Sequence, residues 1–444
     1  MHELVYRLMT RLCALVEPVP VGTNLGLVMV FWMLLTGQLL GTRGAVVPAL
    51  SASGLAPPAV RRAWASLGHG AWSTAELLAA WQQQVAREGV WQARRHAGYQ
   101  ARAGDITGFW RPRLRDCPTT HYRADAGKAL PAIPLGVIGR VGEAGGQRLA
   151  VLQDLVRADP TDPRPGTHNR RVLERAVALQ AADDALVVDA GFGVRLVLAV
   201  GATAWVARER KNFTARRATP PPYAGHGRPP TRGALVRPLA RRYRGRRLAA
   251  TPPDVRVTWE EAGQTVRAEG WQALVLPDAP ADQPPFDVWA IHDPAYPQPW
   301  LLVTPLPIPA RAVRDLYRDR WPVEQVPLAA KQMLGAARQF VHAPETCQRW
   351  PELSLLAGTI LSYVAATLPA VPTGFWDRRP RPTPGRLRRW LTCWPFPQAF
   401  PFPARLREKR SVSAHLPKGN WGQHRRRGTP APTSPPADSP SAVA

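Results

Sequence analysis

The first 95 residues carry their hydrophobic positions at the spacing of helices. Leu25–Leu40 is the longest apolar run, and Thr74–Gly89 repeats apolar residues every three to four positions behind Thr74, which can cap a helix. Between them, Ala45–Ser53 and Pro57–Leu67 flank a glycine-containing turn and read as two short helices. The sequence therefore predicts an all-α region over residues 1–95.

From about residue 96 the pattern changes to short apolar runs typical of strands. Leu130–Val141 and Gln147–Leu152 flank a glycine-rich stretch, which predicts a hairpin. An amphipathic helix is expected over Asn169–Ala181, and the apolar run after it ends at Asp189, as in a buried parallel strand. Thr203–Glu209 reads as the next strand. This alternation of strands and helices predicts an α/β fold.

Residues 211–285 are basic and contain several candidate strands. The stretch from Pro220 to Arg247 is rich in Pro, Gly and Arg, and such a composition does not make a packed core. Short strands are predicted over Val255–Trp259, Thr265–Glu269 and Trp271–Leu276, and again over Phe286–Ile291 and Trp300–Thr304. Helices are expected over Ile308–Arg320 and Arg349–Ala370, before a basic, Pro-rich and largely disordered tail over 396–444.

Four polar residues near the end of this region have a spacing that suggests chemistry. Tyr317, Arg320, Glu324 and Lys331 are separated by steps of three, four and seven, which bring side chains to one face of a helix. A carboxylate between two cations can help to hold a metal while the cations bind phosphates. The alternative is an amphipathic helix with a solvated charged face. Pro327 should remove one hydrogen bond and kink the helix, at about 3 kcal/mol.

Two aspartates are candidates to complete such a site. Asp189 would lie at the carboxyl end of a parallel strand, where open α/β sheets place their active sites. Asp105, within Gly104–Pro112, would lie on the first of three antiparallel strands, although the residues before it are poorly apolar. Asp116 and Asp125 are weaker candidates, and Asp105 could instead be a turn residue.

The charge of the chain indicates a polyanionic partner. Lys and Arg number 58 against 32 Asp and Glu, a net charge of +26, which favours nucleic acid over a membrane. One cluster lies within residues 211–285, and its arginines, with Tyr223 and Tyr243 interleaved, suit phosphate contact and base stacking: Arg241, Arg242, Arg244, Arg246 and Arg247. A solvated loop is the alternative for any single arginine.

Cysteine usage and hydropathy bear on the compartment. The four cysteines are far apart and form no CxxC pair, which argues against zinc and disulfides and fits a reducing cytoplasm. Leu25–Leu40 is shorter than the roughly 20 apolar residues that span a bilayer and contains Thr36 and Gln38. We expect a buried helix, no membrane partner and a cytoplasmic, nucleoid-associated protein, with a membrane anchor as a distant alternative.

The spacing of Tyr317, Arg320, Glu324 and Lys331, with Arg-Trp-Pro-x-Glu around Glu324, resembles the Tyr-Arg-Glu-Lys signature of DDE transposases of the bacterial insertion-sequence family four. Asp105 in an Asp-x-Thr and the Asp-x-Gly-Phe that begins at Asp189 look like the family's two other catalytic segments. The resemblance covers roughly residues 96–395. It implies an RNase H-like core in which Asp105, Asp189 and Glu324 hold two Mg²⁺ or Mn²⁺ ions. It also implies a basic, β-rich insertion in this core at about residues 211–285.

The resemblance also implies a function and partners. A DNA transposase binds transposon ends and catalyses metal-dependent strand cleavage and strand transfer, here with Tyr317, Arg320 and Lys331 on the DNA. Double-stranded DNA and a second copy of the chain, as a homodimer assembled on DNA, are the expected partners. The helical region 1–95 is expected to bind DNA as well. The alternative is a catalytically impaired DNA-binding remnant, because of Pro327 or a misplaced Asp105.

Overall fold

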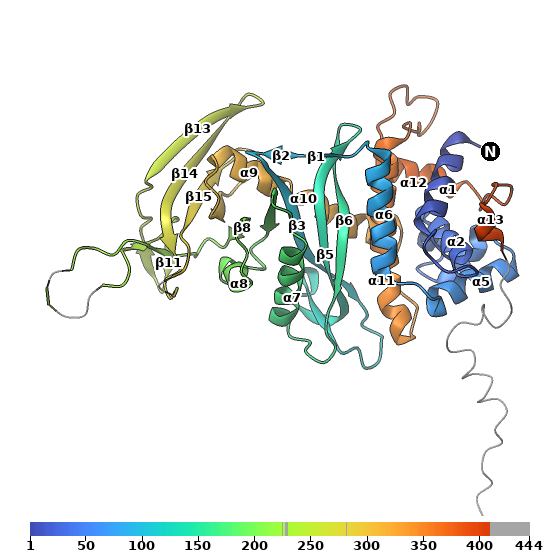
Figure 1. The fold of residues 1–444 in the computed structure, drawn as a ribbon, viewed down its shortest axis with the longest axis horizontal. Coiled ribbons are helices and arrows are strands. Elements are labelled where there is room, and N and C mark those ends of the chain that lie inside the picture. Colours follow the sequence, from blue (N-terminus) through green and yellow to red (C-terminus); the bar gives the residue numbers. More distant parts are fainter. Residues whose placement is uncertain (224, 227–229, 281, 409–444) are drawn as a thin grey trace, which may run out of the picture.

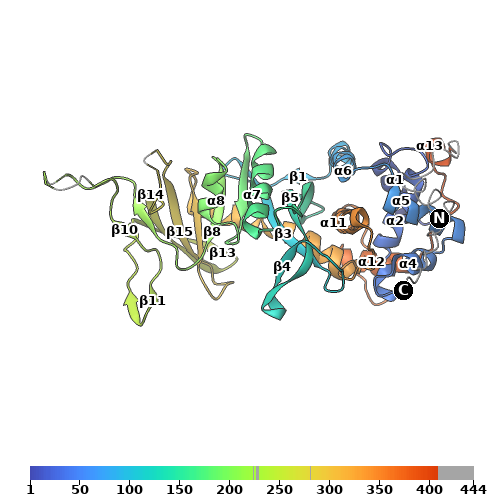
Figure 2. The ribbon, with the colours of Figure 1, turned by 90° about the horizontal axis from the view of Figure 1, so that it is seen from below.

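The computed structural model describes residues 1–223, 225–226, 230–280 and 282–408. Helices gather at one end of an elongated molecule, a mixed sheet runs through its middle, and long β-hairpins form the other end (Figure 1 and Figure 2). The fold is therefore mixed α/β, as the sequence predicts. The expected disordered tail falls mostly on residues 409–444, which lie outside the described residues.

The chain before residue 90 forms helices, as predicted. They are α1 (Glu3–Leu15), α2 (Asn24–Leu35), α3 (Gln38–Gly41), α4 (Val46–Ala52), α5 (Pro57–His69) and α6 (Thr74–Glu88). The expected cap of α6 was wrong by one residue. Ser73 accepts a hydrogen bond from the Glu76 N–H while Glu76 accepts one from the Ser73 N–H, a capping box. Thr74 instead donates to Glu352 at 2.6 Å.

The longest apolar run forms two helices rather than one. Gly37, at a φ of +69°, separates α2 from α3, because a left-handed residue ends a helix. Apart from Leu25, every residue of α2 is buried, and the helix packs against α5 and the long helix α11 (Pro344–Thr367). No helix of the described residues is long and apolar enough to cross a membrane.

The middle of the sheet begins with an antiparallel set. The strand β3 (Tyr99–Trp110) pairs with β5 (Lys128–Ala144), and β5 pairs with β6 (Gln147–Arg157). Short strands flank this set: β1 (Gln92–Ala93), β2 (Arg95–His96) and β4 (Thr120–Arg123), which precedes the 3₁₀ turn η1 (Ala124–Ala126). Asp105 lies on β3, the first strand of the set.

Parallel strands continue the sheet on the other side of β3. The strand β7 (Asp184–Val188) is parallel to β3, and β8 (Trp205–Glu209) is parallel to β7. The helix α7 (Pro165–Ala178) precedes β7, and α8 (Val194–Ala199) connects β7 to β8. The local order is β6-β5-β3-β7-β8, with β3, β7 and β8 parallel.

The β-rich insertion is continuous with this sheet. The strand β16 (Trp300–Thr304) pairs with β8, and the sheet continues through β15 (Phe286–His292) and β14 (Gln264–Val275). Beyond them lie β13 (Val255–Glu261), β9 (Ala215–Arg217) and β10 (Leu235–Val236). Two strands predicted separately form the single β14, which contains a bulge between Trp271 and Leu274.

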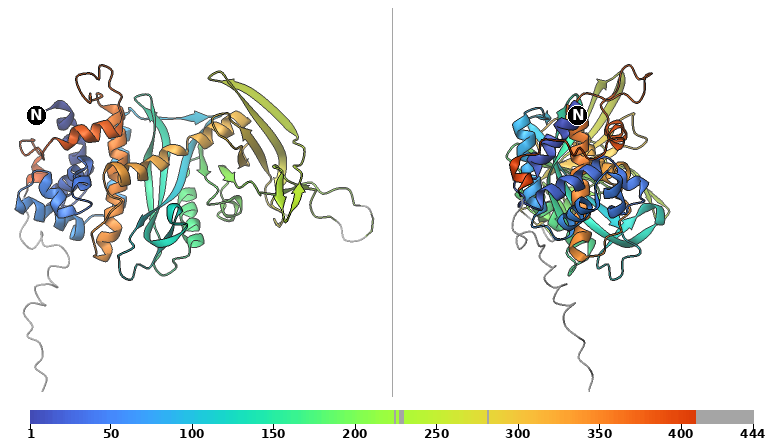
Figure 3. Two further views of the ribbon diagram at one scale, coloured as in Figure 1. Left: turned by 180° about the vertical axis from the view of Figure 1, so that it is seen from behind. Right: turned by 90° about the vertical axis from the view of Figure 1, so that its right-hand side faces the viewer.

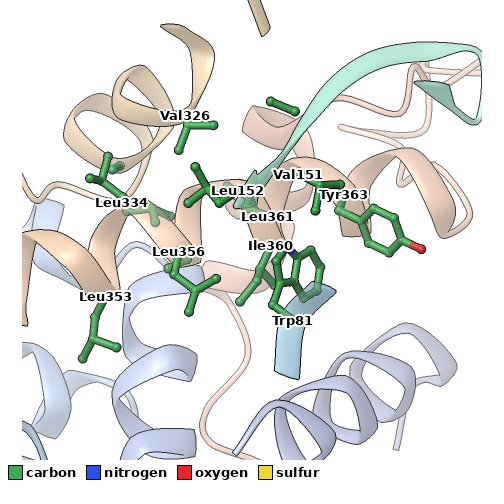
Figure 4. Packing of buried hydrophobic residues seen from close by; sticks show 14 of the residues in the cluster. Trp81, Val151, Leu152, Val326, Leu334, Leu353, Leu356, Ile360, Leu361 and Tyr363 are labelled. Carbon is green, nitrogen blue, oxygen red and sulfur yellow. The ribbon is translucent and has the colours of Figure 1, made fainter. Parts of the chain in front are cut away.

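The C-terminal helices connect the two ends of the molecule. They are α9 (Ala310–Arg318), α10 (Trp321–Leu328), the π turn η2 (Ala329–Met333), α11, α12 (Pro384–Thr392) and α13 (Ala404–Arg407). Seen from behind, α9 and α10 run across the sheet toward α11 (Figure 3). The core between α11, α6 and β6 is aromatic and aliphatic, and Trp81 meets Tyr363 edge-on with ring centroids 5.2 Å apart (Figure 4).

Candidate active site

Two of the predicted carboxylates lie at adjacent strand ends. The parallel pairing of β3 with β7 ends at Ala103 and Val187, and two residues further along lie Asp105 and Asp189. Both side chains are partly buried, and both line one cavity of about 290 Å³. Carboxyl ends of parallel strands meet at one edge of a sheet, so this proximity follows from the topology.

The charges that act on Asp105 include that of the third carboxylate. The pKa of Asp105 is raised to about 6, mainly by burial; the charge of Arg320 lowers it, and the negative charges of Asp189 and Glu324 add to the rise. Like charges disfavour one another's ionised form. A cation placed among the three carboxylates would stabilise the ionised form of Asp105.

The four spaced residues lie on three consecutive elements rather than on one helix. Tyr317 lies in the last turn of α9, Arg320 caps α10, Glu324 lies in the first turn of α10, and Lys331 lies in η2. A helix ending at Arg320 was expected, and α9 ends at Arg318, so the four residues do not share one continuous helix face. Arg320 nevertheless contacts the Glu324 carboxylate, and its guanidinium lies 5.6 Å from the centroid of the Tyr317 ring.

A buried aspartate that the sequence did not single out holds the junction of α9 and α10. Asp319 is 1% exposed and accepts hydrogen bonds from Arg94 at 3.2 Å and Arg148 at 3.3 Å, with His96 Nε2 at 2.8 Å. Burial raises the pKa of Asp319, but the His96 contact and the two arginines lower it below its usual range overall. Its partners are more than 170 positions away, so no local spacing could reveal them.

Pro327 changes the geometry of the helix that carries Lys331. A proline has no N–H to donate to the carbonyl of Val323. The α-helix ends one residue later, and the π turn η2 follows, in which Leu334 N–H donates to Ala329 O at 3.0 Å. Such π turns often occur at functional sites.

Lys331 reaches the strand that carries Asp105. Its Nζ donates to Thr107 Oγ1 at 2.6 Å and lies 4.9 Å and 4.8 Å from the ring centroids of Phe109 and Trp110. Burial lowers the pKa of Lys331 to about 8, although the charge of Asp105 acts in the opposite direction. The ammonium group is therefore largely charged at pH 7, at a cost that an anionic ligand would offset.

Two histidines lie beside the predicted aspartates. His121 and His168 line the cavity that Asp105 and Asp189 share. Neither ring nitrogen of His168 has a hydrogen-bond partner among the described residues, and burial lowers the pKa of His168 to about 4. The histidines are 47 positions apart in a scattered set of ten, so sequence spacing did not mark them.

The donor set suits a hard divalent cation, but the three carboxylates are not gathered at coordination distance. Carboxylate oxygens are the ligands that Mg²⁺ and Mn²⁺ prefer. Among the residues that the structure describes, no three His, Cys, Asp or Glu side chains are close enough to hold a metal ion. Glu324 contacts Arg320 instead, and its side chain is 36% exposed.

The arginine cluster of the insertion lies away from these residues. Arg241 and Arg242 belong to β11 (Arg241–Tyr243), which pairs with β12 (Arg246–Leu248), where Arg246 and Arg247 lie. Arg244 and Gly245 turn the chain with φ of +46° and +77°, as a two-residue hairpin requires. Residues 241–248 of the predicted β-rich insertion thus form a hairpin, at the end of the molecule far from the N-terminal helices (Figure 1).

Comparison with known proteins does not assign the chain to a family. Neither protein-family models nor curated protein sequences match the chain.

Proposed function

We propose that this protein is a DNA transposase with an RNase H-like catalytic core. The strand order β6-β5-β3-β7-β8 and the placement of Asp105 and Asp189 at neighbouring strand ends support this core. The observation that carries the proposal is the approach of four separated segments to one place. The charges of Asp189 and Glu324 act on Asp105, and Lys331 contacts the strand that bears Asp105.

Each residue has a role in this proposal. Asp105, Asp189 and Glu324 would hold Mg²⁺ or Mn²⁺, which supplies activation of a water or a 3′-hydroxyl and charge stabilisation at the leaving oxygen. Arg320 and Lys331 position the phosphates and neutralise their charge, as phosphoryl chemistry requires. Tyr317 supports Arg320, because the guanidinium of Arg320 lies over the Tyr317 ring. The Tyr317 hydroxyl accepts a hydrogen bond from Arg208 at 3.5 Å, which holds the ring in position.

The partners in this proposal are double-stranded DNA and a second copy of the chain assembled on it. The net charge of +26 supports a polyanion, and Arg61 of α5 is exposed in the helical region proposed to contact DNA. We place the protein at the nucleoid in the cytoplasm, where its substrate lies.

The direct test uses the purified protein and a plasmid that carries the coding sequence with its own flanking DNA. We expect strand breaks in the flanks with Mg²⁺ or Mn²⁺ and none with EDTA. Mapping the breaks by primer extension gives the ends of the element. The proposal fails if the protein neither binds nor cuts this DNA.

A binding remnant is the second candidate, and one observation favours it. Glu324 contacts Arg320, and no three carboxylates among the described residues lie at metal-binding distance. Binding of the flanking DNA without cleavage under any divalent metal would select this candidate over the enzyme.

The salt dependence of DNA binding should report on the arginine hairpin. Each phosphate contact to duplex DNA contributes a slope of about −0.9 in log affinity against log salt concentration. Replacing Arg242, Arg244, Arg246 and Arg247 by Ala should therefore flatten the slope by up to about 3.6 and weaken binding to all sequences alike. Filter binding at several salt concentrations measures it, and an unchanged slope would remove the hairpin from the DNA path.

The pH dependence of DNA binding should report on Lys331. With a pKa of about 8, this side chain loses its charge as pH rises from 7 to 9, whereas an ordinary lysine stays charged. A hydrogen bond to a charged group contributes about 1.5–3 kcal/mol, so affinity should fall about tenfold over this range. Lys331→Arg should remove the fall.

Lys211→Arg is the matched control, because Lys211 is exposed and donates to Gln298 at 2.8 Å. A fall that persists in Lys331→Arg would show that another group titrates.

A further inference from the structure

A second cavity, of about 760 Å³, forms a groove beside Trp110, separate from the cavity that Asp105 and Asp189 share. It is lined by the end of β3 with the segment that follows it, and by residues 337–342. Trp110 lies between this groove and the candidate active site, since it lines the groove and the centroid of its ring lies 4.8 Å from Lys331 Nζ. Among the described residues no Asp or Glu lines the groove, whereas Arg111, Arg113, Arg123 and Arg338 do.

Arg111 is a buried cation without a counter-ion. It is 4% exposed and donates to Gln339 Oε1 at 3.1 Å, to the Val341 carbonyl and to Cys347 Sγ at 3.5 Å, all of which are neutral. Its guanidinium pairs with no carboxylate of the described residues. A buried, unpaired charge costs free energy, and in a low-dielectric setting an anion in the adjoining groove would offset that cost.

Two further arginines at the groove are exposed and unpaired. Neither Arg113 nor Arg338 forms an ion pair with any residue that the structure describes, whereas Arg123 pairs with Asp125 at 2.7 Å. Gln339 is 9% exposed, and its Nε2 has no hydrogen-bond partner among the described residues. The groove therefore has unsatisfied donors and positive charge, both of which suit phosphate.

Aromatic rings give the groove a second property. Phe340 is 54% exposed, which is unusual for so apolar a side chain, and it lines the groove with Trp110. Arginines beside exposed rings are the combination with which proteins bind unpaired nucleic-acid strands, because a free base stacks on a ring while the backbone meets the cations. Bases of an intact duplex are stacked on one another and offer no free face.

We propose that this groove binds a single-stranded segment of nucleic acid, with a base stacked on Phe340 and phosphates held by Arg113 and Arg338. The inference rests on the proposed function only for the source of that strand, which is DNA opened at the candidate active site. Trp110, which lines the groove and lies beside Lys331, connects the groove with the candidate active site.

The test measures the binding of a labelled oligothymidylate of about ten nucleotides by fluorescence anisotropy in EDTA, where no cleavage occurs. Phe340→Ala should weaken binding about tenfold, because stacking contributes about that much per base, while Phe340→Trp should retain it. Replacing Arg113 and Arg338 together by Ala should flatten the salt slope by about 1.4, at about 0.7 per contact for a single strand.

Matched controls separate the groove from general charge and from folding. Arg405→Ala removes one exposed arginine of α13, outside the proposed DNA-binding regions, that forms no ion pair with a described residue, and it should leave the affinity unchanged. A duplex of equal length should lose less than about twofold in Phe340→Ala, since its bases cannot reach the ring. Unaltered thermal unfolding of Phe340→Ala, expected of an exposed residue, shows that the fold persists.

The outcomes distinguish this inference from the proposed function. If Phe340→Ala and the double variant of Arg113 and Arg338 both bind the oligothymidylate as tightly as the parent, the proposed single-strand site is wrong. This holds even if the parent cuts its flanking DNA. Equal losses for duplex and single strand would also overturn that site and make the groove part of a duplex path. Selective loss for the single strand supports the groove, even if the parent cuts no DNA and the proposed activity fails.

Discussion

Replacing Glu324 by Gln should reduce metal-dependent DNA cleavage by at least about a hundredfold while leaving DNA binding intact. Gln keeps the shape of the side chain and removes the charge that balances a divalent cation. The change also frees Arg320 from its contact with the Glu324 carboxylate, so affinity for DNA should be equal or slightly higher. Cleavage and binding are measured on the same flanking-DNA substrate.

The control is Glu174→Gln, which changes an exposed glutamate of α7 whose carboxylate lies 3.9 Å from Arg170. It should alter neither cleavage nor binding. Cleavage that survives in Glu324→Gln would remove this residue from the proposed metal site. Loss of both cleavage and binding would instead indicate that Glu324 organises Arg320 and Tyr317 for contact with DNA.

Local patterns predicted the elements whose cause is local. The apolar run before Asp189 is a buried strand because each of its residues lies between layers, and β7 is buried throughout. The predicted hairpin also has a local cause. Gly145 and Gly146, both at positive φ, form the turn between β5 and β6. These strands and β8, which is parallel to β7, make up most of the sheet around the candidate site, so local patterns predicted most of that sheet.

The features that the sequence concealed depend on contacts between distant residues. The segment before Asp105 reads as poorly apolar because Arg102, 3% exposed, pairs with the fully buried Asp184 of the neighbouring strand at 2.6 Å. A charged side chain is compatible with a central strand when such a partner is present. Asp319 and the groove around Arg111 were missed for the same reason.

The stability of the metal-free protein should increase when Asp105 is replaced by Asn. The Asp105 carboxyl has a pKa of about 6 in the folded protein and an ordinary value near 3.8 when unfolded. Between these values the unfolded chain releases its proton first, so the free energy of unfolding falls as pH rises from about 4 to 6. Two pKa units correspond to about 3 kcal/mol, which is the upper bound for the gain.

Asp105→Asn should therefore unfold like the parent at pH 4 and be more stable by about 1–3 kcal/mol at pH 7.5 in EDTA. Adding Mg²⁺ should narrow the difference, because a cation stabilises the ionised carboxylate of the parent and has less to bind in the variant. Urea unfolding at both pH values measures the effect, with Asp282→Asn, an exposed aspartate, as the neutral control. A variant less stable than its parent at pH 7.5 would show that attraction to Arg320 and Lys331, rather than burial and repulsion, dominates at Asp105.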